Sequence, residues 1–254
     1  GLVPTPLLGS MLTELALLAA DEPDADALAR LAEGTAIGAV VFDPDYVING
    51  GIADVVVAAT DGKLTRWSGF SAEPVASMDP TRRLARLTPQ RTAPVGADPG
   101  IIDAAAILLA AEQIGAATRC LELTVDYTKE RVQFGRPIGS FQALKHRMAD
   151  LYVAVQGARA VVNDAVAEPS PSSAALARVA ASEAFNKVAA DGIQLHGGIA
   201  ITWEHDMHLY FKRAHGSSQL LGPPRAHLRR LESEVFRPVT MQSGRDEEKP
   251  GNLL

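Results

Sequence analysis

The chain has only one cysteine, Cys120, among its 254 residues. A single cysteine cannot form a disulfide within the chain, and it cannot build a cysteine-rich metal site. Because unpaired thiols are typical of a reducing compartment, we expect a cytoplasmic protein. Residues 1–4 lack an initiating methionine, a basic stretch and a cleavage signature, so they are not a targeting signal. We expect that further residues precede them in the full protein.

The chain also has no excess of positive charge, because it contains 24 Lys and Arg but 30 Asp and Glu, which gives a net charge of −6. Nucleic-acid binding normally needs a basic face, so this balance gives it no support. Long apolar runs are scarce as well: residues 101–111 are interrupted by Asp103 and followed by Glu112. A membrane helix needs about 18 apolar residues, so we expect a buried bundle helix there and no membrane span.

Aromatic residues make up only 5% of the chain, whereas hydrophobic residues make up 47%. This composition favours alanine-rich helices that pack closely. Helical periodicity is followed by short strand-like runs separated by turn formers, and then by helical periodicity again. The expected helices cover residues 9–20, 26–31 (with Gly34 as C-cap), 98–129, 141–167, 173–195, 205–214 and 224–236; the expected strands cover 36–42, 46–48, 55–59, 64–67 and 84–87.

These elements predict an α+β fold that is mainly α. We expect four parts: the end of an N-terminal helical domain (1–33), a small β-domain (34–96), a C-terminal antiparallel helix bundle (97–236) and a tail with little structure (237–254). The Glu-Pro-Ser-Pro linker at 168–171 separates the second and third bundle helices, because proline cannot continue a helix.

Residues 131–146 join the first two bundle helices and carry many groups suited to ligand binding. Glycine and proline at 135, 137 and 139 end the helical pattern, and Ser140 is placed to cap the next helix. A cofactor with phosphates and a flat ring system needs cations, amides and aromatic faces, although the same residues also occur in solvated turns. The stretch offers Arg131, Arg136, Lys145, Gln133, Gln142, Phe134 and Phe141.

A second rich stretch covers residues 194–204. Its paired glycines, Gly197 and Gly198, remove side chains where a backbone could approach a flat or phosphorylated ligand. A plain helix C-cap is the alternative explanation for a Gly-Gly pair. The polar residues around this pair are Gln194, Thr202 and Glu204.

Together the two stretches resemble the flavin-binding segments of acyl-CoA dehydrogenases. RVQFGRPIGSFQALKHRMADL, from residue 131, is similar to the hairpin of that family, and Gln-x-x-Gly-Gly followed by Thr-x-Glu is similar to its second segment. The resemblance is strong over residues 98–236 and weak over 1–95. It implies FAD as cofactor, with contacts that reach across a subunit interface into the flavin site of a neighbour.

The resemblance also implies a role for each matching residue. Arg131 would neutralise the FAD pyrophosphate, because a guanidinium can hold two phosphate oxygens at once. Gln133 and Phe134 would line the same groove. The remaining implied FAD contacts are Phe141 and Gln142 near the adenine end, and Gln194, Gly197, Gly198, Thr202 and Glu204 at the adenosine half.

The catalytic carboxylate of that family has no counterpart at the expected places. Such a base removes the α-proton of the thioester while a hydride passes to the flavin. The two positions that carry it in the family correspond to Gly222 and to about Ala105, and neither residue can accept a proton. Glu112 is a candidate for a displaced base, although a glutamate in the middle of such a helix is more often paired or solvated. The flavin-facing Ser/Thr-rich segment with Trp is likewise not found in the β-domain.

This combination resembles the heteromeric acyl-CoA dehydrogenases of actinobacteria that act in sterol side-chain β-oxidation. In those α2β2 enzymes one subunit supplies the base and the other completes the FAD site. The resemblance implies that this chain is the base-less partner in the α,β-desaturation of an acyl-CoA, expected to carry a steroid side chain. Two alternatives stay open: a homotetramer with a relocated base such as Glu112, and a flavin-free scaffold subunit.

Other chemistries find less support in the sequence. His205 and His208 stand three apart on an expected helix, a spacing that can bind zinc. No cysteine pair, further spaced histidine or HExxH pattern accompanies them, so we expect no metal. A serine hydrolase is equally unsupported, because no Gly-x-Ser-x-Gly motif occurs. The remaining candidates for acid–base chemistry, expected instead to be hydrogen-bonded structural residues, are His196, His215 and His227.

Overall fold

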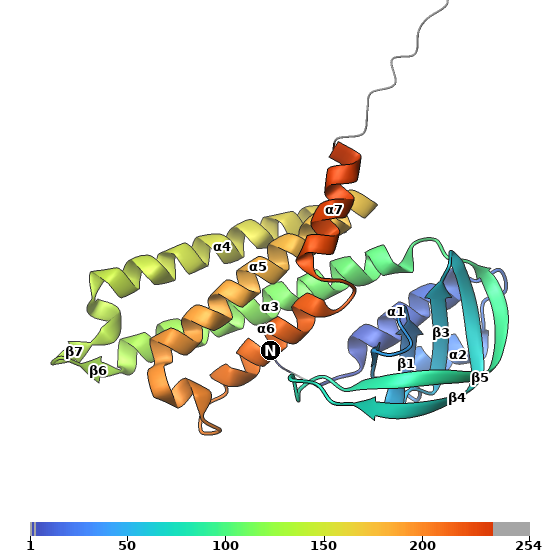
Figure 1. Cartoon of the computed structure of the whole chain (residues 1–254), viewed down its shortest axis with the longest axis horizontal. Coiled ribbons are helices and arrows are strands. Elements are labelled where there is room, and N and C mark those ends of the chain that lie inside the picture. Colours follow the sequence, from blue (N-terminus) through green and yellow to red (C-terminus); the bar gives the residue numbers. More distant parts are fainter. Residues whose placement is uncertain (1, 3, 236–254) are drawn as a thin grey trace, which may run out of the picture.

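The computed structural model describes residue 2 and residues 4–235, and it shows a small sheet beside a long helix bundle (Figure 1). The expected mainly helical α+β fold is confirmed. The helices are α1 (Leu7–Leu18), α2 (Ala25–Ala32), α3 (Ile101–Glu130), α4 (Gln142–Ala167), α5 (Pro171–His196), α6 (Met207–Gln219) and α7 (Pro224–Val235). The strands are β1 (Gly38–Val41), β2 (Val47–Ile48), β3 (Val55–Thr60), β4 (Lys63–Val75), β5 (Leu84–Ala97), β6 (Val132–Gln133) and β7 (Arg136–Pro137).

The main sheet has five strands in the order β1-β3-β4-β5-β2, and β1 and β3 are parallel. Its centre is valine-rich and buried, which explains why the sequence predicts these strands. β4 and β5 are much longer than expected, since they pair as an antiparallel ribbon from Lys63 with Ala97 to Val75 with Leu84. Most side chains on the outer part of this ribbon are exposed, so no hydrophobic pattern marks it.

Helix α1 packs closely on the sheet because two glycines leave room for it. A Cβ at Gly38 would lie 2.6 Å from Thr13, and a Cβ at Gly9 would lie 2.7 Å from the Gly38 carbonyl oxygen. The Gly38 amide donates to the Ser10 hydroxyl at 3.1 Å. Together with the packing of Leu12, these contacts cover one face of the sheet with α1.

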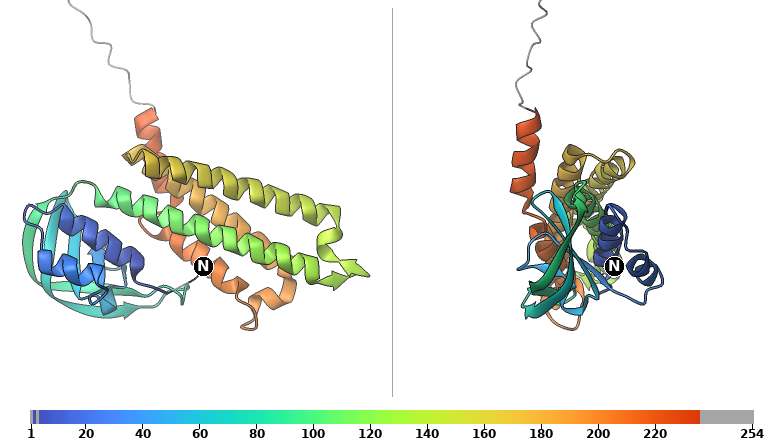
Figure 2. Two further views of the ribbon diagram at one scale, coloured as in Figure 1. Left: turned by 180° about the vertical axis from the view of Figure 1, so that it is seen from behind. Right: turned by 90° about the vertical axis from the view of Figure 1, so that its right-hand side faces the viewer.

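The bundle is built around α5, which packs against α3, α4, α6 and α7. Helix α3 runs antiparallel to α4 (Figure 2). An 18-residue window of α3 has a mean hydropathy of 1.5, so by length and composition alone this helix could cross a membrane, contrary to the sequence estimate. In the fold, 56% of that window is buried, and alanines form much of the contact with α5. The prediction that this run is a bundle helix is confirmed.

Several helix boundaries differ from expectation: α1 lies two residues earlier (Leu7–Leu18), α3 begins three residues later, at Ile101, and α6 begins two residues later, at Met207. Ser140 does not cap α4: its hydroxyl donates to the Pro137 carbonyl at 2.7 Å, and Phe141 is the N-cap residue. Helix α5 begins at Pro171, two residues early, because Ser170 and Ser173 form a reciprocal capping box. Helix α6 extends five residues further than expected, to Gln219. The predicted tail lies outside the described residues.

Candidate functional site

The two motif-bearing stretches lie at the same end of the bundle, and we call residues 131–142 and 194–204 the bundle-end surface. Tyr127, in the last turn of α3, donates from its hydroxyl to the carbonyl of His196 at 3.2 Å. The rings of the same two residues stack with centroids 4.2 Å apart. This contact joins the hairpin after α3 to the Gly-Gly segment after α5. Both segments lie toward the left end of the bundle in Figure 1.

The hairpin presents aromatic and cationic groups outward. Phe134 is 92% exposed and has a φ of 54°, an uncommon value for a residue with a side chain. Its ring meets Phe141 edge-on at 6.1 Å, and the Arg136 guanidinium lies 4.0 Å from the Phe141 ring centroid. Within the described chain no carboxylate pairs with Arg131 or Arg136. Exposed cations and rings of this kind fit a ligand that is both anionic and planar.

The amides of the hairpin are available at the surface. The Gln133 side chain donates to the neighbouring Val132 carbonyl at 2.8 Å, and Gln142 is an exposed first residue of α4. Neither amide is buried by the rest of this chain. Both can therefore turn toward a molecule that docks on the bundle end.

The Gly-Gly segment leaves open space where side chains would stand. A Cβ at Gly197 or at Gly198 would meet no atom within 4 Å, so packing inside this chain does not require either glycine. The φ of 68° explains Gly197 as a helix-terminating residue. No such backbone requirement accounts for Gly198, whose bare backbone would let a ligand approach.

Polar residues flank this open backbone. Thr202 donates to the Ile199 carbonyl at 2.8 Å and accepts from the Glu204 amide at 3.3 Å, which shapes the turn into α6. The side chains of Gln194 and Glu204 are exposed. The structure thus brings all ten predicted FAD-contact residues to one surface of the bundle, whereas their contact with FAD stays a prediction.

The rings of His196 and His205 pack against each other beside the Gly-Gly segment. His196 is 4% exposed, and its Nδ1 hydrogen-bonds the Gly192 carbonyl at 2.8 Å. Burial lowers the pKa of His196, and the ring of His205 at a centroid distance of 4.6 Å acts in the same direction. His208 packs edge-on against Trp203 at 4.6 Å. Among the described residues no three metal-binding side chains gather into a cluster.

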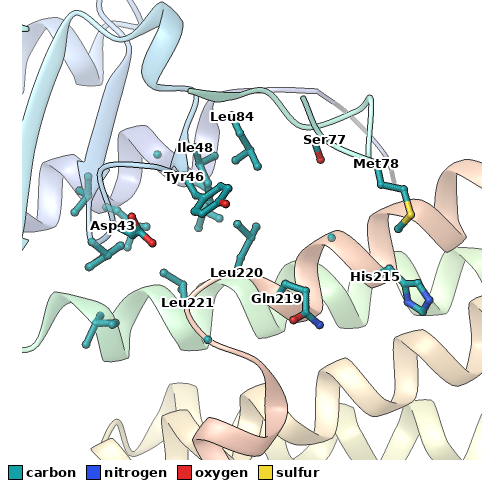
Figure 3. Close-up of a pocket in the computed structure, with 18 of the residues that line it drawn as sticks. Asp43, Tyr46, Ile48, Ser77, Met78, Leu84, His215, Gln219, Leu220 and Leu221 are labelled. Carbon is teal, nitrogen blue, oxygen red and sulfur yellow. The ribbon is translucent and has the colours of Figure 1, made fainter. Parts of the chain in front are cut away.

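A cavity of about 800 Å³ lies at the other end of α3, between the sheet and the α6–α7 loop (Figure 3). Gly222, which the sequence analysis predicts to match the base position of the family, lines this cavity with a φ of 96°. Ala105, the approximate match predicted for the second base position, is completely buried in α3. Among the described lining residues, Asp43 is the only carboxylate.

Glu112 lies outside this cavity, in a network of ion pairs. Its Oε1 accepts hydrogen bonds from Arg82 and, at 2.9 Å, from Arg213. Arg213 also pairs with Asp79 at 2.7 Å and donates to Thr81. The structure therefore favours an ion-paired role for Glu112, and its use as a displaced base gains no support from geometry.

Sequence reasoning missed the residues that hold the cavity walls. The ion pair between Arg213 of α6 and Asp79 of the β4–β5 loop (residues 76–83) joins residues that are 134 positions apart in the sequence. No local sequence pattern predicts such a contact. Arg178 of α5 is 1% exposed and donates to the Leu220 carbonyl at 2.9 Å. Only the presence of charged residues in otherwise alanine-rich helices could have drawn attention to them.

Comparisons with known proteins agree with the geometry. Residues 79–235 match the family model described as acyl-CoA dehydrogenase, C-terminal domain. The chain is 74% identical over 235 residues to acyl-CoA dehydrogenase IpdE2 of Mycobacterium tuberculosis, an alignment that covers 92% of this chain and 74% of the relative.

Two solved structures share the fold. The ChsE4-ChsE5 complex from Mycobacterium tuberculosis matches with a TM-score of 0.80 and 25% identity, covering 92% of this chain and 76% of the other. A variant of the Tcur3481-Tcur3483 steroid ACAD matches with a TM-score of 0.78 and 26% identity, covering 91% and 76%.

Proposed function

This chain belongs to the acyl-CoA dehydrogenase family, and from that premise we propose that it completes the FAD site of a second, base-carrying subunit. The enzyme so formed would desaturate an acyl-CoA thioester between its α and β carbons. This chain would contribute cofactor binding, and its partner would contribute the catalytic carboxylate.

One observation carries the proposal: the hairpin of the bundle-end surface lies at the end of α3 that is remote from the sheet (Figure 2), whereas the cavity lies at the sheet end of α3. Ile102 lines the cavity, while Arg131 directly follows the helix. At a rise of 1.5 Å per residue these two positions are roughly 43 Å apart along the helix. The hairpin is therefore far from a ligand beside Ile102 in its own chain, which supports the proposal that its exposed groups serve another molecule.

The side chains of the bundle-end surface suit FAD. Arg131 and Arg136 would meet the pyrophosphate, Phe134 and Phe141 would offer flat faces, and the open backbone at Gly198 would admit the adenosine half. Gln133, Gln142, Gln194, Thr202 and Glu204 would supply hydrogen bonds. When bound, FAD would act as the acceptor of the substrate hydride.

Proton removal would fall to the partner. In this chain the base position is Gly222, and Glu112 is held by two guanidinium groups. A heteromeric assembly is supported by the ChsE4-ChsE5 complex, one chain of which shares this fold. A steroid-derived acyl group is supported by the neighbour described as a steroid ACAD. We expect the assembly to be an α2β2 tetramer in the cytoplasm.

The test is to co-express this chain with its partner and to count the flavins in the intact assembly by native mass spectrometry. We expect half as many FAD molecules as chains, and activity only in the complex. A yellow, active protein from this chain alone would instead support a homotetramer with a relocated base.

A point substitution tests the role of the surface itself. Arg131→Ala should weaken FAD retention in the complex by about 10- to 100-fold, because a charge-assisted hydrogen bond contributes about 1.5–3 kcal/mol. Arg119→Ala is the matched control, since Arg119 is also exposed on α3 but pairs with Glu122. Equal FAD retention in both variants would contradict the proposal and favour a flavin-free scaffold.

A further inference from the structure

Tyr127, in the last turn of α3, contacts both stretches of the bundle-end surface and belongs to neither. We propose that Tyr127 is a positioning residue: it holds the Gly-Gly segment (residues 197–204) at a fixed place relative to Arg131, so that FAD meets one preformed site. The identity of the ligand rests on the proposed function, whereas the contacts of Tyr127 do not.

Ring packing places Tyr127 against both ends of the Gly-Gly segment. His196, which precedes the segment, stacks on the Tyr127 ring with centroids 4.2 Å apart. His205, which follows the segment, meets the same ring edge-on at 6.2 Å, and the two histidine rings lie 4.6 Å apart. Contacts between rings at such distances are favourable beyond the area that they bury. The three rings therefore hold the two ends of the segment together.

The Tyr127 hydroxyl fixes the first peptide group of the segment. It donates to the His196 carbonyl at 3.2 Å. Carbonyls in the last turn of a helix have no partner within the helix, so this bond satisfies one that α5 leaves open. The Gly197 amide, in the same planar peptide group, donates to the Ile193 carbonyl. Both sides of this peptide group are thus held, and the segment leaves α5 in one orientation.

The backbone of Tyr127 reaches the other stretch. Its carbonyl accepts from the Arg131 amide at 2.9 Å, and the Arg131 carbonyl accepts from the Ile138 amide at 2.8 Å. In the described part of the chain, no hydrogen bond or ion pair joins residues 131–142 directly to residues 194–204. Tyr127 therefore provides the hydrogen-bonded connection between the two stretches.

A fixed distance between the stretches matters for a ligand that contacts both of them. A Cβ at Gly197 or Gly198 would meet no atom within 4 Å, so packing around the glycines does not hold the segment in place. A segment that is free to move must be ordered when the ligand binds, and this ordering costs binding free energy. The contacts of Tyr127 reduce that cost before FAD arrives.

Titration of the co-expressed complex with FAD, after its flavin has been removed, tests this role. Tyr127→Phe keeps the ring and removes the hydroxyl, so we expect FAD binding to weaken about three- to tenfold, as for one lost hydrogen bond. Tyr127→Leu also removes the stacked ring and should weaken binding further. Tyr210→Phe is the matched control and should leave the affinity unchanged, because Tyr210 is a buried tyrosine of α6 outside both stretches.

A double-mutant cycle separates positioning from a general loss of stability. Gly198→Ala should weaken FAD binding without harming the fold, since the added Cβ would meet no atom of this chain within 4 Å. Once that side chain obstructs the ligand, the exact place of the segment matters less. The double variant with Tyr127→Phe should therefore lose less affinity than the product of the two single losses. A tyrosine that only stabilises the fold would give losses that multiply.

Hydrogen–deuterium exchange of the FAD-free complex reads the segment without any ligand. We expect faster exchange at residues 197–204 in Tyr127→Phe and no change there in Tyr210→Phe. Unchanged exchange, unchanged FAD affinity in the two Tyr127 variants, or multiplicative losses in the cycle would each overturn the inference. Failure of the proposed function would be seen separately, as a wild-type complex that binds no FAD.

Discussion

Breaking the ion pair of Asp79 with Arg213 should destabilise this protein strongly. The two side chains are 2% and 5% exposed, and their charged atoms lie 2.7 Å apart. Removing one partner of a buried pair typically costs 3–5 kcal/mol, because the other charge stays buried without compensation.

The remaining hydrogen-bond partners of Arg213 determine where in that range we expect the loss of unfolding free energy to lie. After Asp79→Ala, Glu112 would still accept from the guanidinium at 2.9 Å, and the Thr81 carbonyl would still accept at 2.8 Å. We therefore expect the low end of the range, about 3 kcal/mol. For a chain of this size that corresponds to a fall in Tm of roughly 6–12 °C.

Differential scanning calorimetry of the purified protein measures this change, and a double-mutant cycle isolates the pair. Asp79→Asn combined with Arg213→Met removes both charges, so we expect the double variant to lose less stability than the sum of the two single variants. Glu122→Gln, which breaks an exposed ion pair on α3, should leave Tm unchanged within error. Strict additivity, or a loss below about 1 kcal/mol for Asp79→Ala, would refute the reasoning.

Two further predictions follow from buried titratable groups. Burial raises the pKa of the Cys120 thiol to about 12. Iodoacetamide at pH 8 should therefore leave this thiol unmodified in the native protein and alkylate it only in denaturant. Rapid alkylation of the folded protein would contradict the burial of Cys120. Burial lowers the pKa of His196 below its ordinary 6.5, so the unfolded chain binds the proton more readily and stability should fall as the pH drops below about 6.5. His196→Phe should flatten the dependence of Tm on pH between about 7 and 5, and an unchanged slope would assign that dependence to other groups.

The sequence predicts the long helices well because each carries a local signal. Asp98 and Pro99 predict a helix start, and α3 begins at Ile101, where Gly100 is the N-cap residue and Asp98 accepts from the amides of Gly100 and Ile101 at 2.9 Å. The proline-containing linker predicts the break before α5, whereas the capping box of Ser170 and Ser173 places the start of α5 two residues earlier than expected. Strand lengths are less predictable, because the β4–β5 ribbon is held by backbone pairing between largely exposed residues.

The bundle-end surface and the cavity also differ in how far the sequence predicts them. The motif residues of the bundle-end surface are close in sequence within each stretch, so their chemistry can be recognised before the fold is known. The cavity cannot be recognised this way, since its walls depend on contacts such as Arg178 to Leu220, which are 42 positions apart. Its lining combines residues from α1, the sheet, the β4–β5 loop and α6.

The separation of these two sites within one chain constrains how an assembly can work. If the bundle-end surface of each subunit serves the other subunit, an assembly of two different chains contains two kinds of completed cavity. One kind has the cavity of the partner and the hairpin of this chain, with Arg131 and Phe134; the other has the cavity of this chain, where Gly222 is the residue predicted to match the base position. We therefore expect proton removal from the acyl-CoA substrate in the first kind, where the partner would supply the carboxylate.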